Sequence, residues 1–207
     1  MLLRSLARNE STTVNNNTLA RDMVDLDDET ISFPTLSDYL DVLGRLYIIE
    51  EQPAFNPNMR SSVRVGKTPK RRFTDPSLAI AALGATPKMM MEDLNTYGLM
   101  FESMCIRDLE IYAGSFGGKV YHYRDGDGRG IDAVIELQDG RWGAFEIKLG
   151  ADRVDKAAEK LLKIDELISE NRRYKGPSVL CVICGMSSAA YKRDDGVYVI
   201  PITSLKN

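Results

Sequence analysis

Two carboxylates and a lysine stand close together within residues 131–149. Thirteen residues separate Asp132 from Glu146, and Lys148 follows two positions later. If residues 138–140 form a three-residue hairpin loop with Gly140 in the left-handed conformation, the register places Asp132 opposite Glu146. The pattern therefore predicts that these three side chains meet at one end of a strand pair.

The two faces of this hairpin differ in chemistry, because successive side chains of a strand point to opposite sides. We expect the core on the face with the apolar side chains of Ile131, Ala133, Ile135, Leu137, Phe145, Ile147 and Leu149. The other face carries Asp132, Glu136, Trp142, Glu146 and Lys148, while Val134 and Arg141 do not fit the pattern. The charged cluster is thus expected on the face opposite the core.

Directly opposed carboxylates repel each other unless a positive charge offsets them, from Lys148 or from a divalent cation. Asp132, Glu146 and the backbone carbonyl of Ile147 are hard oxygen ligands of the kind that Mg²⁺ or Mn²⁺ selects. A metal held there can polarise a phosphodiester and generate hydroxide, while Lys148 can orient the water or stabilise charge on the phosphorane. Glu102, on the preceding helix, could add a third carboxylate.

The elements around the hairpin predict an α/β core. Apolar spacing indicates a helix over residues 97–112, which carries Glu102, a strand over 119–124 and, after the hairpin, a helix over 152–171. An apolar strand, SVLCVICG, and a last strand over 197–202 follow. A helix between two apolar strands is a crossover, so we expect those two strands to be parallel.

The N-terminal part predicts three short helices, then a strand and a turn at Gln52 and Pro53, which is the order of a winged helix-turn-helix. The exposed side of the third helix carries Asp38, Asp41 and only Arg45, which is a poor electrostatic match for phosphates. A structural or protein-contacting winged helix is therefore favoured over a sequence-specific DNA reader.

One stretch of the sequence is strongly basic. It holds Arg60, Arg64, Lys67, Lys70, Arg71 and Arg72, with no acidic residue between them. One interpretation is contact with the phosphates of a nucleic acid. The other is a solvated linker that contains a strand, because Lys and Arg are normally exposed. The sequence leaves both interpretations open.

Composition and missing motifs exclude several classes of function. The 207 residues carry 27 basic and 30 acidic side chains, so affinity for nucleic acid needs a local patch. The chain has no GxxxxGK[ST] loop and no GxGxxG after a strand, and its single histidine, His122, argues against a Ser-His-Asp triad or a multi-histidine zinc site. Cys181 and Cys184 are expected to be buried thiols. No apolar run reaches the roughly 18 to 20 residues of a membrane span, and no signal peptide is recognisable, which predicts a cytoplasmic protein.

Asp132 with Glu146-Ile147-Lys148 resembles the D-x(n)-E-x-K signature of the PD-(D/E)XK nuclease superfamily, and Glu102 matches the glutamate of that family's first helix. Most of the chain also resembles a domain of unknown function that follows the ATPase module in many bacterial and archaeal AAA-type ATPases. The motifs that carry this second resemblance are FTDPSLAIAALG (73–84), GLMFESMCIRDL (98–109), YHYRDGDGRGIDAVIE (121–136) and AFEIKLG (144–150).

These resemblances imply a winged-helix-like domain with a basic strand or linker over residues 1–85. They also imply a restriction-endonuclease-like mixed sheet flanked by helices over residues 86–207. The implied activity is Mg²⁺- or Mn²⁺-dependent cleavage of nucleic acid. In it, Asp132, Glu146 and the carbonyl of Ile147 hold the metal, while Glu102, Asp132, Glu146 and Lys148 are catalytic. Arg124 matches the family pattern and is expected either to contact nucleic acid or to be an ordinary surface residue at a strand end.

Two alternatives stay open beside the nuclease. One is a catalytically silent module that binds nucleic acid or protein as the output domain of an ATPase. The other is a salt-bridged acidic hairpin in which Lys148 neutralises Asp132 and Glu146 for stability alone. The chain lacks the ATPase module that the resemblance implies, so we expect a truncated piece or a gene remnant. The oligomeric state is left open.

Overall fold

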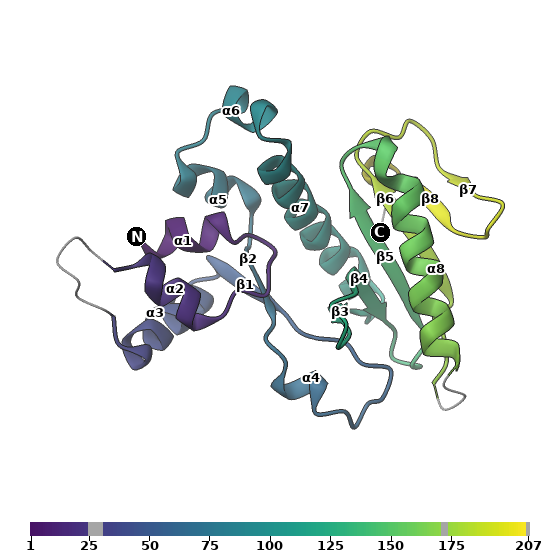
Figure 1. Cartoon of the computed structure of the whole chain (residues 1–207), viewed down its shortest axis with the longest axis horizontal. Coiled ribbons are helices and arrows are strands. Elements are labelled where there is room, and N and C mark those ends of the chain that lie inside the picture. The colour runs from purple at the N-terminus through teal and green to yellow at the C-terminus, as the bar shows by residue number, and fades with distance from the viewer. Residues whose placement is uncertain (25–30, 171–173, 206–207) are drawn as a thin grey trace. The chain divides into compact units, whose positions relative to one another are not determined.

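The computed structural model describes residues 1–24, 31–170 and 174–205. The chain divides into two compact units (Figure 1). Unit 1 comprises Met1–Gln52 and Thr68–Met104, and unit 2 comprises Pro53–Lys67 and Cys105–Asn207. Each unit has a hydrophobic core of its own. The expected domain boundary between residues 85 and 86 stays a prediction.

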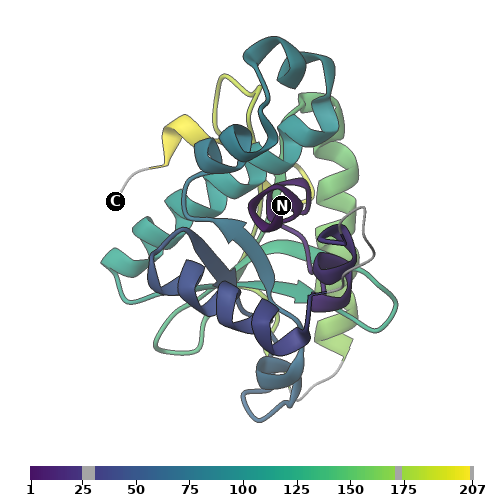
Figure 2. The ribbon, with the colours of Figure 1, turned by 90° about the vertical axis from the view of Figure 1, so that its left-hand side faces the viewer.

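Unit 1 begins with three helices and a two-stranded antiparallel sheet, whose elements face the viewer in Figure 2. They are α1 (Leu2–Arg8), α2 (Asn16–Asp22), α3 (Phe33–Arg45), β1 (Ile49–Gln52) and β2 (Lys70–Phe73). The side chain of Ser32 accepts the hydrogen bond of the Thr35 backbone N–H and so begins α3, which has Pro34 in its first turn. The predicted order of three helices and a strand is confirmed, while the winged-helix assignment stays a prediction.

The rest of unit 1 consists of α5 (Pro76–Leu83), α6 (Pro87–Glu92) and the start of α7 (Leu94–Ser115). The carboxylate of Asp75 caps α5, and Gly84 ends it in the left-handed conformation at φ 67°. Both caps are typical of helix ends in sequence, where Pro often follows the first cap and Gly often forms the last. Helix α7 passes from unit 1 into unit 2 after Met104.

Unit 2 is built on a six-stranded mixed sheet with the order β3-β4-β5-β6-β8-β7. The strands are β3 (Lys119–Arg124), β4 (Gly130–Glu136), β5 (Trp142–Lys148), β6 (Val179–Cys184), β7 (Tyr191–Lys192) and β8 (Tyr198–Pro201). Strands β3, β4 and β5 pair antiparallel, whereas β5, β6 and β8 pair parallel. This mixed sheet confirms the expected α/β class.

Helix α8 (Val154–Glu170) follows a 3-10 turn, η1 (Ala151–Arg153), and connects β5 to the parallel strand β6. It runs along β5 and β6 (Figure 1) and buries its apolar side in the core of unit 2. The buried residues of the helix are Val154, Ala157, Ala158, Leu161, Ile164 and Ile168. The crossover predicted from the sequence is therefore confirmed. A second 3-10 turn, η2 (Ile202–Ser204), follows β8.

The segment Pro53–Lys67 belongs to unit 2 although it lies between β1 and β2 in the sequence. Ala54 forms a parallel bridge with His122 of β3, and the ring of Phe55 packs in the core of unit 2. The segment contains a short helix, α4 (Val63–Gly66). It thus contributes a side chain to the core beneath the hairpin β4–β5. In the described part of the chain, every helix is too short or too polar to cross a membrane.

Candidate functional site

The hairpin β4–β5 has the register that its sequence predicts. Gly140 is left-handed at φ 80°, and the backbone N–H of Leu137 donates to the carbonyl of Arg141 over 2.8 Å. Pairing runs from Glu136 with Trp142 to Ala133 with Phe145. Continued by one residue, the same register sets Asp132 against Glu146. The three-residue loop therefore fixes which carboxylates meet.

The atoms expected to hold a metal converge on the ammonium group of Lys148. Its Nζ lies 2.8 Å from Asp132 Oδ2, 2.9 Å from Glu146 Oε2 and 3.0 Å from the carbonyl oxygen of Ile147. The backbone N–H of Ile147 donates to Asp132 Oδ2 over 2.9 Å, which fixes that carboxylate from the other side. The oxygens of Asp132, Glu146 and Ile147 thus surround one position, and the ammonium group of Lys148 occupies it.

Glu146 is completely buried, and a second lysine helps to hold it there. Lys160 of α8 donates to Glu146 Oε1 over 2.7 Å. Burial, and next the charge of Asp132, raise the pKa of Glu146, although Lys148 and Lys160 act in the opposite direction. For Lys148, burial favours a lower pKa, but the carboxylates of Asp132 and Glu146 outweigh it and hold the pKa above its usual value. With both carboxylates ionised and both lysines protonated, the four side chains together carry no net charge.

Sequence reasoning missed Lys160, and the residue had a recognisable signal. It lies beside the buried positions Ala157 and Leu161 of α8 rather than on the helix side farthest from them. In an amphipathic crossover helix, a lysine next to the apolar stripe can reach the sheet that the stripe covers. Its partner could not be identified without the tertiary structure.

The expectation that the core lies opposite the charged face is correct only in part, because the charged face is buried as well. Val134, Trp142 and Ala144 point to the same side as the two carboxylates and are buried in the cluster that α8 completes. Ala133 and Ile147 of the other face are buried as well. The sheet is covered on both sides because a crossover helix packs on the face that we expected to be polar. This covering accounts for the burial of Glu146.

The fourth predicted catalytic residue, Glu102, lies in unit 1. Its carboxylate accepts a hydrogen bond from Lys70 Nζ over 2.7 Å, and both side chains are largely buried. The structure thus brings Asp132, Glu146 and Lys148 together in unit 2 and pairs Glu102 with a lysine of unit 1. A role for Glu102 as the auxiliary carboxylate stays a prediction.

The basic stretch is divided between the two units, and most of its charges are paired. In unit 1, Arg71 binds Glu51 over 2.8 Å, and the buried Arg72 binds Glu50. In unit 2, Arg64 makes two parallel hydrogen bonds to the carboxylate of Glu136, over 2.9 and 2.8 Å. Guanidinium groups compensated in this way are less available for phosphates.

The remaining predicted cations lie in unit 2. Lys67 Nζ donates to the carbonyl oxygen of Arg124, and the side chains of Arg124 and Arg60 are exposed. Arg64 also lies over the rings of Phe55 and Tyr121, 4.8 and 5.6 Å from their centres. These contacts connect the segment Pro53–Lys67 to β3. Phosphate binding by any of these residues stays a prediction.

The donor set of the hairpin suits a hard divalent cation. Among the residues that the structure describes, Glu146 Oε2 accepts no hydrogen bond, although Lys148 Nζ lies 2.9 Å away as an ion pair. A buried oxygen with an unused lone pair beside Asp132 Oδ2 and a carbonyl fits Mg²⁺ or Mn²⁺. In the described ranges, no group of three or more His, Cys, Asp or Glu side chains is placed to hold a metal, and the hairpin itself contributes two carboxylates.

The cysteines are buried thiols, as predicted. Burial raises the pKa of Cys181 to about 12, which keeps this thiol protonated and unreactive.

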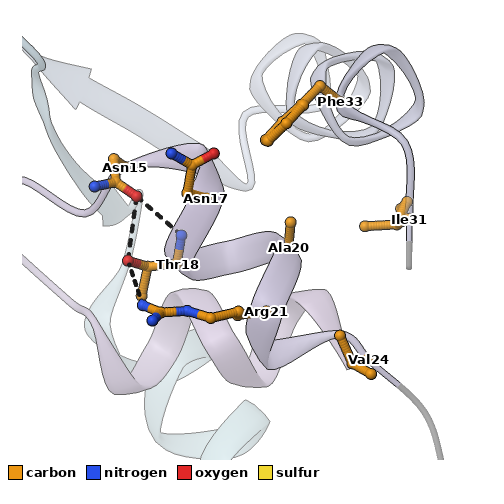
Figure 3. A pocket seen from close by; sticks show the side chains of 8 residues that line it. All are labelled: Asn15, Asn17, Thr18, Ala20, Arg21, Val24, Ile31 and Phe33. Atoms are coloured by element: carbon orange, nitrogen blue, oxygen red, sulfur yellow. Dashed lines mark hydrogen bonds between the residues drawn. The ribbon is translucent and has the colours of Figure 1, made fainter. Parts of the chain in front are cut away.

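A pocket of about 460 Å³ lies in unit 1 between α2 and the start of α3 (Figure 3). Its apolar wall includes Ala20 and Phe33, and at its polar end Asn15 accepts a hydrogen bond from the backbone N–H of Thr18. None of the predicted site residues lines this pocket.

Two protein-family models match the chain. Residues 1–89 match a domain of unknown function (DUF8612), and residues 97–205 match another (DUF4143). Searches of curated proteins and of solved structures found no significant match. DUF4143 is a domain found in AAA-ATPase-associated proteins, which agrees with the second resemblance for residues 97–205, whereas the motif at 73–84 lies in the DUF8612 match. The DUF4143 match contains Asp132, Glu146, Lys148 and Lys160 and covers just over half of the sequence, so the chain belongs to the DUF4143 family.

Proposed function

We propose that unit 2 carries a nuclease-type site that hydrolyses phosphodiester bonds with the help of Mg²⁺ or Mn²⁺. The observation that carries this proposal is the convergence of Asp132 Oδ2, Glu146 Oε2 and the Ile147 carbonyl on one cation position. Three oxygen groups around one point are costly to assemble unless a cation is held there.

Each side chain of the site has a role in the proposed reaction. Asp132 and Glu146, with the carbonyl of Ile147, would hold the metal, which when bound polarises the phosphodiester and lowers the pKa of its water. Lys148 would orient the attacking water and stabilise the negative charge that develops on the phosphorus oxygens. Water adds its oxygen to phosphorus and loses a proton to solvent, the bond to the leaving oxygen breaks, and that oxygen takes up a proton from solvent. Lys160 positions Glu146.

The fold of unit 2 supports the same proposal. Asp132 lies on β4 and Glu146-Ile147-Lys148 on β5, between α7 and the crossover helix α8. This is the element order that we expect for a restriction-endonuclease-like domain. Solvent reaches the site from the lysine side, because the side chains of Lys148 and Lys160 are 24% and 37% exposed. A phosphate can approach from this side. We further propose that the chain is the C-terminal part of an AAA-type ATPase and that helices α1 to α3 with β1–β2 form a winged helix.

Asp132→Asn is the sharpest test, because it removes the charge while keeping the size of the side chain. We expect the wild-type protein to cleave linear DNA or RNA in Mn²⁺, and the variant to lose about a hundredfold or more of that rate. The matched control is Asp139→Asn, since Asp139 is an exposed loop carboxylate of the same hairpin that pairs with Arg141. Wild-type protein that cleaves neither nucleic acid in Mg²⁺ or Mn²⁺ would overturn the proposal.

One observation favours a second candidate, a silent output domain of an ATPase. Arg60 is exposed and lies in the segment Pro53–Lys67 rather than on the hairpin, so it can contact a phosphate without any hydrolytic site. A domain of this kind binds a partner without hydrolysis. Binding of DNA that survives Lys148→Ala, weakens with salt and needs the exposed Arg60 would support this candidate over the nuclease.

A further inference from the structure

Lys148 occupies the position that a metal ion would need. Its ammonium group lies 2.8 to 3.0 Å from each of the three oxygen groups, and it donates hydrogen bonds to Asp132 Oδ2 and to the Ile147 carbonyl. Mg²⁺ binds oxygen ligands at about 2.0 to 2.1 Å, which places it within the same group of atoms. Two cations so close together repel strongly in a poorly solvated site. The ammonium and the metal therefore exclude each other.

We propose that Lys148 is the internal cation of this site, and that a divalent metal enters only when Lys148 moves away to an anionic phosphate. This inference rests on the proposed function, because the phosphate is that of the substrate. The exchange makes metal binding and phosphate binding cooperative, because Lys148 then pairs with the phosphate while the metal pairs with the carboxylates. Without phosphate, the ion pair of Lys148 with Asp132 and Glu146 keeps the metal out.

The surroundings of Lys148 allow this exchange. Its side chain keeps contact with solvent, whereas Glu146 beneath it has none. Lys160 remains bound to Glu146 Oε1 over 2.7 Å when Lys148 leaves, so the buried carboxylate keeps one partner. The backbone N–H of Ile147 continues to hold Asp132 Oδ2. The oxygen groups thus stay in place with one net negative charge, which a divalent cation can bind.

Lys148→Met tests the exchange, because methionine has nearly the same length and no charge. MnCl₂ is titrated calorimetrically into the whole chain in buffer free of phosphate. We expect the variant to bind one Mn²⁺ at least about tenfold more tightly than the wild-type protein. Lys163→Met is the matched control, since Lys163 is an exposed lysine of α8, and it should leave the affinity unchanged.

A second measurement uses the wild-type protein and does not depend on the folding of the variant. Dimethyl phosphate, a phosphodiester that resists hydrolysis, is added at increasing concentration during the same titration. The affinity of the wild-type protein for Mn²⁺ should rise with the phosphodiester, whereas that of Lys148→Met should stay constant. The inference is overturned if the variant binds Mn²⁺ no more tightly, or if the phosphodiester leaves the wild-type affinity unchanged. Cleavage by the wild-type protein would still support the proposed function in that case.

Discussion

Lys148 and Lys160 offset the electrostatic repulsion between the two carboxylates on the hairpin. Sequence reasoning found Lys148 because it lies two positions after Glu146, on the same face of one strand. It missed Lys160 because that residue reaches the site from a helix fourteen residues away. The spacing within a strand is a local property and can be predicted. A partner across the sheet–helix interface depends on packing that no local pattern specifies.

Glu10 is a second buried carboxylate, and it lies in unit 1. It is completely buried and accepts hydrogen bonds from the backbone N–H of Phe73, over 3.0 and 3.2 Å, and from the hydroxyl of Ser103, over 2.6 Å. Burial raises its pKa to about 7, although the hydrogen bonds from Ser103 and Phe73 act in the opposite direction. Glu10 thus connects the end of α1 to β2 and α7. No sequence signal distinguished it from a surface glutamate.

Glu10 predicts a pH dependence for the stability of unit 1. Its pKa is higher in the folded chain than in the unfolded chain, so the folded state binds the proton more tightly. The stabilisation is fully present below about pH 4.5 and is lost as the pH rises through about 7, by roughly 3 kcal/mol in total. Replacing Glu10 with Gln removes the titration. The free energy of unfolding of Glu10→Gln should therefore fall less between pH 5 and pH 8 than that of the wild-type protein.

Urea unfolding followed by circular dichroism measures this difference. Fluorescence of Trp142, the single tryptophan, reports on unit 2 and should respond less to the substitution. An equal pH dependence in the two proteins would show that the carboxyl group of Glu10 titrates normally in the folded chain.

The segment Pro53–Lys67 is the element whose place could not be foreseen. Its second half lies in the basic stretch that begins at Arg60, for which both a solvated linker and phosphate contact were open interpretations. In the structure, the backbone N–H groups of Phe55 and His122 donate to the carbonyls of His122 and Pro53, over 2.6 and 2.9 Å. The segment thereby pairs with β3 at the edge of the sheet. One buried aromatic residue anchors it, and a single position gives no periodic signal.

Phe55→Ala is expected to destabilise unit 2 by about 3 to 5 kcal/mol, because it leaves a cavity in the core. The ring of Phe55 lies 4.9 Å from that of Trp142 and 5.9 Å from that of Tyr121. Urea unfolding followed by the fluorescence of Trp142 measures the loss. Met59→Ala, at an exposed position of the same segment, is the control and should change the stability by about 0.5 kcal/mol or less. A Phe55→Ala effect as small as that of the control would show that the segment is not part of the core.

Helices and strands with strong local patterns were predicted closely. Strand β3 has the expected bounds of residues 119–124, and α5 is capped by Asp75 before Pro76 and by Gly84 after Leu83. Alternation and capping are local, so they can be read without knowledge of the fold. Burial of both faces of the sheet depends on where α8 packs, which no local pattern specifies. For that reason the sequence did not predict that the charged face of the hairpin is buried.

The whole molecule has a small net charge of −3, and at the hairpin site positive and negative side chains likewise offset each other. Two carboxylates and two ammonium groups meet at the hairpin β4–β5, and most of the basic stretch is paired in the same way. The DUF4143 match agrees with the AAA-associated region that the sequence motifs indicated. In the proposed exchange, Lys148 leaves the hairpin site for a phosphate and a metal ion takes its place.

Anomalous diffraction from crystals of the whole chain, soaked with MnCl₂ and dimethyl phosphate, would locate both cations during this exchange. We expect a manganese peak about 2.1 to 2.2 Å from the carboxylates of Asp132 and Glu146 and from the carbonyl oxygen of Ile147. Lys148 Nζ should then lie outside this group of atoms, against the phosphate. A site without manganese, in which Lys148 still bridges the two carboxylates, would contradict the account.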